Sequence, residues 1–234
     1  MLNGYYNPYY YDPTYILVIA AFLLSAIASF GVKITFARYS GVRNTRGLTG
    51  ADAAKYVLSA GGVNGVRIER VSGNLTDHFD PKAGVIRLSD STYASTSVAA
   101  VGVAAHEAGH AIQHDTGYVP IKLRNGMVPV VNIGNVMSMP VFMLGLILGR
   151  PNLAMIGVIL FSGVLVFQLL TLPVEFNASI RAMRILRERD LLGHHELPKA
   201  KKVLFAAAMT YVAAVAATAL QIIRLLGLLN RRRR

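Results

Sequence analysis

Four long apolar stretches alternate with polar segments along the chain. They cover residues 16–34, 128–148, 153–174 and 203–229, and each is close to the length of about 20 apolar residues that a helix needs to cross a bilayer. A short link at 149–152, which contains a glycine and a proline, is typical of a turn. The pattern therefore predicts a multi-pass membrane protein in which the second and third stretches form a helical hairpin.

The fourth stretch is the least uniform of the four. It is rich in alanine at first and in leucine later, and Gln221 and Arg224 interrupt it. Alanine-rich helices also pack inside proteins, and a spanning helix here would put the arginines at 231–234 outside, against the rule that basic loops face the cytoplasm. We expect a spanning helix, with a helix lying in the membrane interface as the alternative.

The 37–127 segment has ordinary polarity and predicts a small α+β unit. Thr49 and Asp52 match a capping box, which marks the start of a helix. Residues 66–71 alternate between apolar and polar positions, which predicts a strand with one buried face, and residues 85–88 predict a second strand. A longer helix rich in alanine and valine is expected to follow these strands.

Composition strengthens the membrane interpretation. Hydrophobic residues make up 53% of the 234 residues and charged residues only 15%, whereas soluble domains carry about 25% charged residues. This excludes a disordered chain and argues against a purely soluble globule. The chain has no cysteine, so a disulfide framework and a thiolate metal site are excluded, and metal ligands would have to be His, Asp or Glu.

The distribution of charge predicts the topology. The net charge is +12, but the basic residues lie between and after the apolar stretches rather than on one compact module, so we expect the lipid bilayer and no nucleic acid as a partner. Residues 1–15 are rich in tyrosine and contain no lysine or arginine. The positive-inside rule therefore places this N-terminal segment outside and the 37–127 and 175–202 segments in the cytoplasm.

An H-E-x-x-H motif, formed by His106, Glu107 and His110, lies in the middle of the helix expected over 98–116. Residues four apart share one face of a helix. The two imidazoles can therefore hold one Zn²⁺, and Glu107 can act as general base toward a metal-activated water. A packing helix with a polar groove is the alternative, but burying this cluster without a metal would be costly.

A catalytic zinc site has three protein ligands and an open position. His114 lies eight residues beyond His106, which is about 12 Å along a helix, so we expect a structural role for it. Glu175 follows the third apolar stretch and is expected to open a basic helix over 175–189. Because the hairpin returns Glu175 to the side of the membrane that holds the motif, we expect it to be the third ligand, with an interaction with the helix dipole as the alternative.

Longer strings around these residues resemble a known family. Residues 72–78, 106–114 and 174–179 are similar to the YugP-like neutral zinc metallopeptidases, which are bacterial integral-membrane proteins, and the resemblance covers about residues 15–229. More distantly, the chain is similar to membrane gluzincins of the CAAX-protease and heat-shock-protease type. In those proteins the third ligand opens a Glu-aromatic-x-Ala-Asp string, and here Ser179 replaces the Asp.

The resemblance implies a gluzincin-like zinc endopeptidase of the bacterial cytoplasmic membrane, with its active site facing the cytoplasm. One Zn²⁺ per chain would be bound by His106, His110 and Glu175. Glu107 would be the catalytic base that accepts the proton of the attacking water. The substrate would be a protein or peptide.

Two supporting roles follow from the same resemblance. The Asp that is missing here usually orients a ligand histidine, so Ser179 or Asn177 would take that role. A neighbouring strand often holds the peptide, and the strand at 85–88 is the expected candidate. The alternative is a non-proteolytic membrane scaffold with a structural or vestigial zinc site, although such a site needs no base like Glu107. A homo-oligomer or a membrane partner is left open.

The expected fold is therefore mainly α, with a small zincin-like α+β unit between membrane helices. Its expected segments are a Tyr-rich tail (1–15), a first membrane helix (16–36), the α+β unit with the H-E-x-x-H helix (37–127), a membrane hairpin (128–174), a basic cytoplasmic helix with the third ligand (175–202), a fourth membrane helix (203–229) and a basic tail (230–234).

Overall fold

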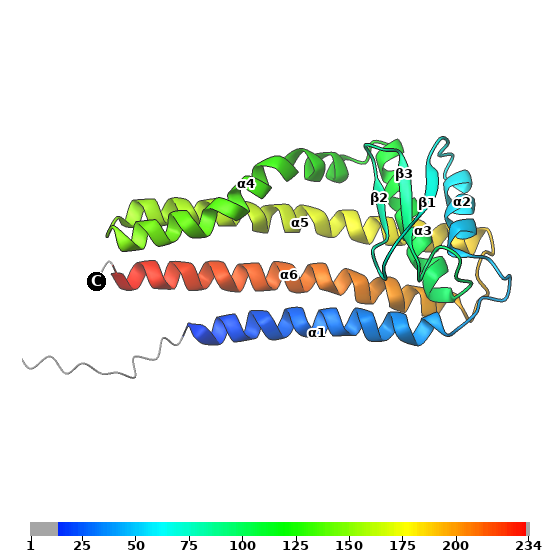
Figure 1. Ribbon diagram of the computed structural model, residues 1–234, viewed down its shortest axis with the longest axis horizontal. Helices are drawn as coiled ribbons and strands as arrows, with labels where there is room; N and C mark the ends of the chain where they lie inside the picture. The colour runs from blue at the N-terminus through cyan, green and yellow to red at the C-terminus, as the bar shows by residue number, and fades with distance from the viewer. Residues whose placement is uncertain (1–13, 233–234) are drawn as a thin grey trace, which may run out of the picture.

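The computed structural model describes residues 14–232, and this part of the chain is mainly helical (Figure 1). Most of the Tyr-rich tail and the last two residues of the basic tail lie outside the described residues. The described elements are α1 (Tyr15–Ser40), α2 (Gly50–Ala60), β1 (Arg67–Val71), β2 (His78–Asp80), β3 (Val85–Ser89), α3 (Val98–Asp115), α4 (Val119–Ile147), α5 (Pro151–Glu188) and α6 (Leu197–Arg232).

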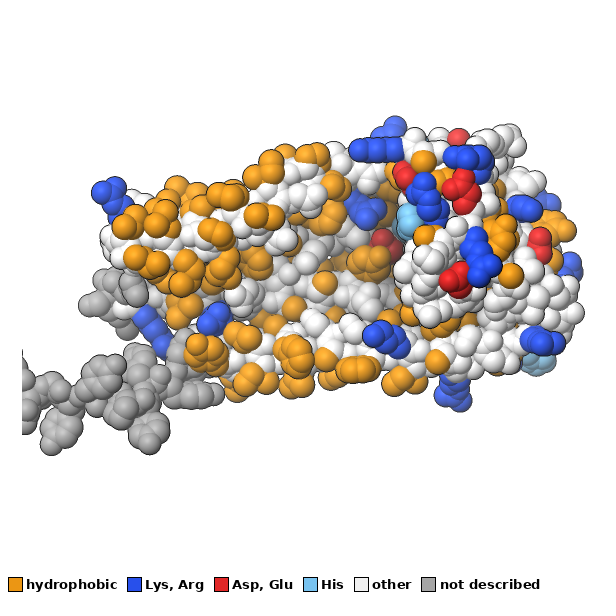
Figure 2. Space-filling model, in the orientation of Figure 1, with side chains coloured by type: hydrophobic (Ala, Val, Ile, Leu, Met, Phe, Trp, Pro, Cys, Tyr) orange, Lys and Arg blue, Asp and Glu red, His pale blue; other side chains and the backbone are white. Residues whose placement is uncertain are grey.

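Four of these helices, α1, α4, α5 and α6, are long and apolar enough to cross a membrane. They lie side by side along the long axis, and the sheet, α2 and α3 lie at one end (Figure 1). Large hydrophobic side chains cover their outer surface, among them Phe22 at 70% exposure and Ile147 at 74%, while charged side chains gather around the α+β end (Figure 2). Apolar surface of this extent needs lipid around it, which confirms the prediction of a multi-pass membrane protein.

The third apolar stretch and the first part of the basic segment after it, up to Glu188, form one helix. The expectation of a new helix opening at Glu175 is wrong, because α5 runs for 38 residues straight through Pro173. Membrane helices tolerate an interior proline, since neighbouring groups satisfy the backbone carbonyl that it leaves without a donor. Glu175 therefore lies inside a helix rather than at its N-terminus, and the alternative role as a partner of the helix dipole does not apply.

The membrane hairpin is longer than its apolar residues suggest. Helix α4 begins at Val119, nine residues before the apolar stretch, with Pro120 in its first turn. Proline is favoured there because the first turn leaves its backbone N–H groups unpaired in any case. The extension places the start of α4 beside the α+β unit (Figure 1).

The α+β unit contains the predicted elements and one additional strand. Thr49 and Asp52 form the predicted capping box at the start of α2. The sheet has the order β1-β3-β2, with β1 parallel and β2 antiparallel to β3. The central strand β3 is the buried one, since Val85, Ile86 and Leu88 are all fully buried. The edge strand β2 is too short and too polar to show the alternation that identifies a strand.

Helix α3 lies at the centre of this unit. Ser97 caps it by accepting a hydrogen bond from the N–H of Ala100. Its alanines and valines are buried against α2, α5 and α6 in one hydrophobic core. The small side chains allow the neighbouring helices to approach closely, so that α3 brings the H-E-x-x-H motif against the interior of the membrane helices.

Candidate metal centre

Three side chains from two helices converge at the junction of the α+β unit and the membrane helices. His106 and His110 lie one turn apart on α3, and their Nε2 atoms are 3.1 Å apart. Oε2 of Glu175 on α5 lies 3.3 Å from Nε2 of His106 and 3.5 Å from Nε2 of His110. The motif and the carboxylate are therefore close in space although about 65 residues of chain separate them.

The three atoms have the spacing of ligands around a single ion. In a tetrahedral zinc site with bonds of about 2.0–2.1 Å, neighbouring ligand atoms lie roughly 3.3 Å apart. The observed spacings of 3.1, 3.3 and 3.5 Å bracket that value. Two imidazoles and a carboxylate also match a known catalytic ligand set for zinc. Among the described residues, His106, His110 and Glu175 form the one group that could hold a metal ion in this way.

The close approach of α3 to α5 brings these ligands together. A Cβ added to Gly109 would lie 2.6 Å from the backbone oxygen of Ala178, so glycine permits the contact. The side-chain amide of Gln113 donates to the carbonyl of Val174 at 2.8 Å and to Oδ1 of Asn177 at 3.0 Å. These bonds fix the register of the two helices on either side of Glu175.

Each histidine has a partner at its second ring nitrogen. Nδ1 of His106 lies 3.0 Å from the hydroxyl of Ser179, and Nδ1 of His110 lies 3.0 Å from Oε1 of Gln113. Because Gln113 uses its amide N–H groups on α5, its oxygen accepts from His110. Nδ1 of His110 then carries a proton, so that Nε2, which lies toward Glu175, can offer its lone pair to a metal. Asn177 contacts Gln113 rather than a histidine.

Burial and charge oppose each other at this centre. Glu175 is only 4% exposed, and a buried carboxylate is costly unless a cation or a donor accompanies it. Burial disfavours protonation of His110, but the carboxylates of Glu175 and Glu107 beside it outweigh burial and raise the pKa of His110 above its usual value. A metal ion would replace that proton and supply the positive charge that the buried carboxylate lacks.

Glu107 lies beside the three converging residues and is itself only 8% exposed. Among the described side chains, none donates a hydrogen bond to its carboxylate. It lines two adjoining cavities, of about 250 and 180 Å³, that share His106 and Glu175 in their walls. A molecule in either cavity would therefore meet this carboxylate and the candidate metal ligands together.

Two further residues in these walls were not identified from the sequence. Tyr211 of α6 lines both cavities, and Arg124 of α4 lines the smaller one. The Nε atom of Arg124 is buried and has no hydrogen-bond partner in the described part of the chain. The sequence signal for Tyr211 was a lone polar ring in the alanine-rich fourth stretch. The signal for Arg124 was one of two cations, with Lys122, close to the start of an apolar stretch.

The expected peptide-binding strand at 85–88 is a wrong assignment. It forms β3, which pairs with β1 on one side and β2 on the other, so both of its edges are occupied. Strand β2 lies at the edge of the sheet, and its residues His78 and Phe79 line the smaller cavity. Strand β2 is therefore the edge strand beside the cavity that an extended peptide could join.

Other titratable residues near the motif have structural partners. His114 packs edge-on against the ring of Phe79 at 5.9 Å, which agrees with the structural role expected for it. Asp77 accepts hydrogen bonds from the N–H and hydroxyl of Ser89. The Arg87 guanidinium donates to Asp80 at 2.9 Å and lowers the pKa of that carboxyl below its usual value. These contacts stabilise the sheet edge beside the cavity.

Comparison with known proteins agrees with this geometry. A family model described as "Putative neutral zinc metallopeptidase" matches residues 14–230. "Putative membrane protease YugP" of Bacillus subtilis (strain 168) is 45% identical over 208 residues, which cover 89% of this chain and 92% of that protein. No solved structure matches the chain at a significant level. The match over nearly the whole length, together with the metal-binding geometry, shows that the chain belongs to the neutral zinc metallopeptidase family that its sequence resembles.

Proposed function

We propose that this protein is a membrane-embedded zinc endopeptidase that hydrolyses peptide bonds at the membrane surface. The observation that carries the proposal is the convergence of His106, His110 and Glu175 in the wall of a cavity that also contains Glu107. A structural zinc site is usually a closed set of four ligands. Here the described residues offer three ligands, and these three residues line a cavity that a water molecule or a substrate can enter.

The metal in this proposal is one zinc ion per chain, held by the two imidazoles of α3 and the carboxylate of α5. When bound, zinc polarises a carbonyl and lowers the pKa of a coordinated water. Ser179 and Gln113 orient the imidazoles through Nδ1, so that both Nε2 atoms face the carboxylate of Glu175. Such outer partners typically change metal affinity or activity by about 10- to 100-fold.

Glu107 is the general base in this mechanism. Its carboxylate lines the same cavity as the metal ligands. It accepts no hydrogen bond from another described side chain. It accepts a proton from the water that attacks the scissile carbonyl and then passes that proton to the amine that leaves. The low exposure of Glu107 keeps bulk water from competing for this transfer.

The cavity walls also supply groups for the substrate. The edge of β2 is open to an extended peptide, whose backbone would pair with the strand beside the cavity. Tyr211 and Arg124 line the wall of the smaller cavity on other helices, and both carry hydrogen-bond donors. They are the candidates to stabilise the negative charge that develops on the carbonyl oxygen during attack.

The proposed location is the bacterial cytoplasmic membrane, with the cavity facing the cytoplasm. Lysine and arginine side chains are concentrated around the α+β end of the molecule (Figure 2). The positive-inside rule assigns that end to the cytoplasm. A substrate would then be a protein or peptide segment presented at the cytoplasmic surface of the bilayer.

The proposal is tested by the single change Glu107→Gln in the full chain. Membrane proteomes of cells that express the wild type or the variant are compared for N-termini that only the wild type generates. We expect such N-termini to disappear in the variant while zinc stays at near-stoichiometric level, since Glu107 is not a ligand. Glu69→Gln, on β1 away from both cavities, is the matched control. Undiminished cleavage by the Glu107→Gln chain, or identical N-termini in cells with and without the wild type, would contradict the peptidase assignment.

A further inference from the structure

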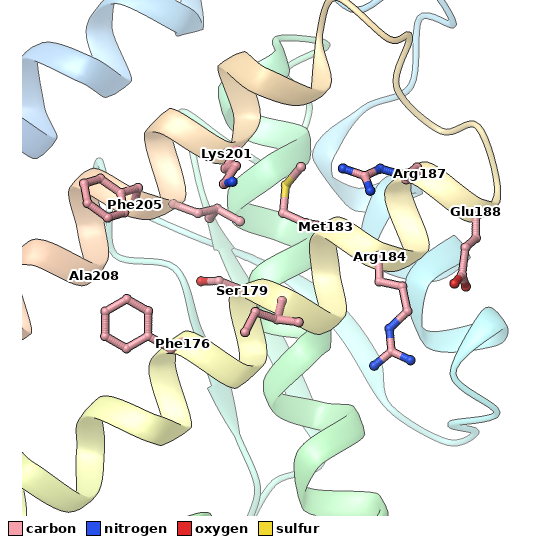
Figure 3. Close-up of a pocket in the computed structure, with 11 residues that line it drawn as sticks. Phe176, Ser179, Met183, Arg184, Arg187, Glu188, Lys201, Phe205 and Ala208 are labelled. Atoms are coloured by element: carbon pink, nitrogen blue, oxygen red, sulfur yellow. The ribbon is translucent and has the colours of Figure 1, made fainter.

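A third hollow lies between α5 and α6 and is not used by the proposed reaction. It has a volume of about 440 Å³ and is formed by facing side chains of the two helices (Figure 3). We call it the α5–α6 groove. The lining residues used below are Phe176, Ile180, Arg184 and Arg187 of α5 and Lys201 and Phe205 of α6.

The α5–α6 groove is apolar at one end and basic at the other. On α5, Phe176 and Arg187 lie about 16 Å apart along the axis, with the phenylalanine at the membrane end and the arginine near the α+β unit. On the antiparallel helix α6 the order matches, since Phe205 lies one turn further into the membrane than Lys201. Figure 3 shows the two aromatic rings at one end and the guanidinium groups toward the other.

The basic end of the groove has more positive than negative charge. Arg184, Arg187 and Lys201 form no ion pair with any described residue, and Glu188 is the acidic residue in the lining. A group with negative charge would therefore be attracted to this end. Lys and Arg side chains near an anionic membrane surface strengthen such attraction.

The apolar end of the groove exposes large hydrophobic side chains. Ile180 is 59% exposed and Phe205 is 56% exposed, and both lie on helices that are long enough to span the membrane. An acyl chain that lies parallel to these helices covers their side chains and needs no hydrogen-bond partner. The combination of an apolar trough and a cationic end fits an amphiphile with an anionic head.

A bound peptide fits the groove less well than an amphiphile. An extended peptide needs partners for its backbone N–H and C=O groups, and the lining consists of two helices whose backbone groups are bonded internally. The two edge strands of the sheet, β1 and β2, contribute no residue to the lining of this groove. The hydroxyl of Ser179, a polar group in the lining, is already bonded to His106.

We propose that the α5–α6 groove binds an anionic phospholipid of the surrounding leaflet. Its head group lies among Arg184, Arg187 and Lys201, and an acyl chain lies along Phe176 and Phe205. This site goes beyond the proposed peptidase function and does not depend on it. Ser179 lines both this groove and the 250 Å³ cavity of the metal centre, so the lipid would contact the outer wall of the catalytic cavity.

The experiment uses the absence of tryptophan from the chain. The full chain with Phe205→Trp carries one fluorescent indole in the groove and is reconstituted into vesicles that contain brominated phosphatidylglycerol or brominated phosphatidylcholine. Brominated acyl chains quench a tryptophan that they contact. We expect the apparent affinity from quenching to be about tenfold higher for the anionic lipid.

Charge removal then tests whether the groove itself provides this preference. Replacing Arg184, Arg187 and Lys201 by Gln in the reporter chain is expected to reduce the preference below about twofold. The matched control replaces Arg189, Lys199 and Lys202 by Gln, which removes the same charge from the same region outside the groove, and is expected to keep the preference. If the first triple variant does not fold, Arg187→Gln alone is expected to reduce the preference about threefold.

Three outcomes would overturn the proposal. Equal quenching by the two lipids in the reporter chain would show that the groove does not select an anionic head. An equal loss in the control variant would assign the preference to the general basic surface. Displacement of the lipid by an acidic peptide at lower concentration would identify a peptide site. Because none of these measurements involves cleavage, they leave the peptidase proposal unaffected.

Discussion

Gly109 of α3 lies directly against the backbone oxygen of Ala178 of α5, where an added Cβ would be only 2.6 Å away. This contact occurs one residue before His110 and three residues after Glu175. A side chain at position 109 would separate the helices at the point where the three candidate ligands meet. The fold therefore requires glycine at position 109, which is a variable position of the H-E-x-x-H motif. The geometry of the three candidate ligands depends on this glycine.

The first prediction follows from this contact. Gly109→Ala should force α5 away from α3, because backbone atoms cannot yield as a flexible side chain can, and overpacking of this kind costs about 1–3 kcal/mol of stability. We expect bound zinc, measured by elemental analysis of the purified chain, to fall well below that of the wild type. Gly163→Ala on α5 is the control, since a Cβ there meets nothing within 4 Å, and it should retain full zinc. Full zinc in both variants would show that the contact does not set the ligand geometry.

Sequence reasoning succeeded where a pattern is local. The capping box of Thr49 and Asp52 and the strand at 85–88 depend on neighbouring residues, and both are present as expected. The two motif histidines were expected to lie side by side because residues four apart share a helix face, and their Nε2 atoms are 3.1 Å apart. Glu175 could be placed beside them because a membrane hairpin returns the chain to the side from which it started.

Sequence reasoning failed where long-range packing decides. Pro173 predicts a helix end from local sterics, but the membrane environment keeps α5 continuous through it. The strand at 85–88 was recognisable, but its central place in the sheet depends on pairing with β2, which has no clear pattern of its own. Tyr211 reaches the metal centre because α6 packs against α3 and α5, and that packing has no local signature.

The second prediction concerns the third ligand. Glu175→Gln keeps the size of the side chain but replaces a charged oxygen by a neutral amide, which is a much poorer zinc ligand. We expect zinc to dissociate on dialysis against a weak chelator under conditions in which the wild type retains it. Glu188→Gln, an exposed change at the end of the same helix, should not alter retention. A Glu175→Gln chain that holds zinc as tightly as the wild type would point to another ligand.

The third prediction concerns the partner of His106. Ser179→Ala removes the oxygen that lies 3.0 Å from Nδ1 of this histidine. Loss of such an outer partner typically reduces metal affinity or activity by about 10- to 100-fold, so we expect a decrease in that range in zinc affinity or peptide cleavage. Ser162→Ala is the control, because the Ser162 hydroxyl donates to the carbonyl of Val158 within α5. Equal behaviour of the two variants would remove Ser179 from the role that the resemblance implies.

The fourth prediction separates substrate activation from metal binding. Tyr211→Phe removes one hydroxyl from the wall of both cavities. Loss of a donor that stabilises a developing oxyanion lowers kcat by about 10²- to 10³-fold, and we expect that loss with zinc content and KM little changed. Tyr56→Phe, an exposed tyrosine on α2, is the control. A parallel loss of zinc in the Tyr211→Phe chain would assign the ring to the structure of the centre instead of the reaction.

The last prediction concerns the orientation of the protein in the membrane. The chain has no cysteine, so single cysteines can be introduced without a background reaction. Ala83 lies in the exposed turn between β2 and β3, and Asn152 is exposed in the first turn of α5, directly after the link from α4. The β2–β3 turn and the start of α5 lie at opposite ends of the long helices (Figure 1). If the α+β end faces the cytoplasm, a maleimide that cannot cross membranes will label the Asn152→Cys chain in intact cells. It will label the Ala83→Cys chain only after the cells are opened. Labelling of the Ala83→Cys chain in intact cells would place the metal centre on the outer side and would require a substrate outside the cytoplasm.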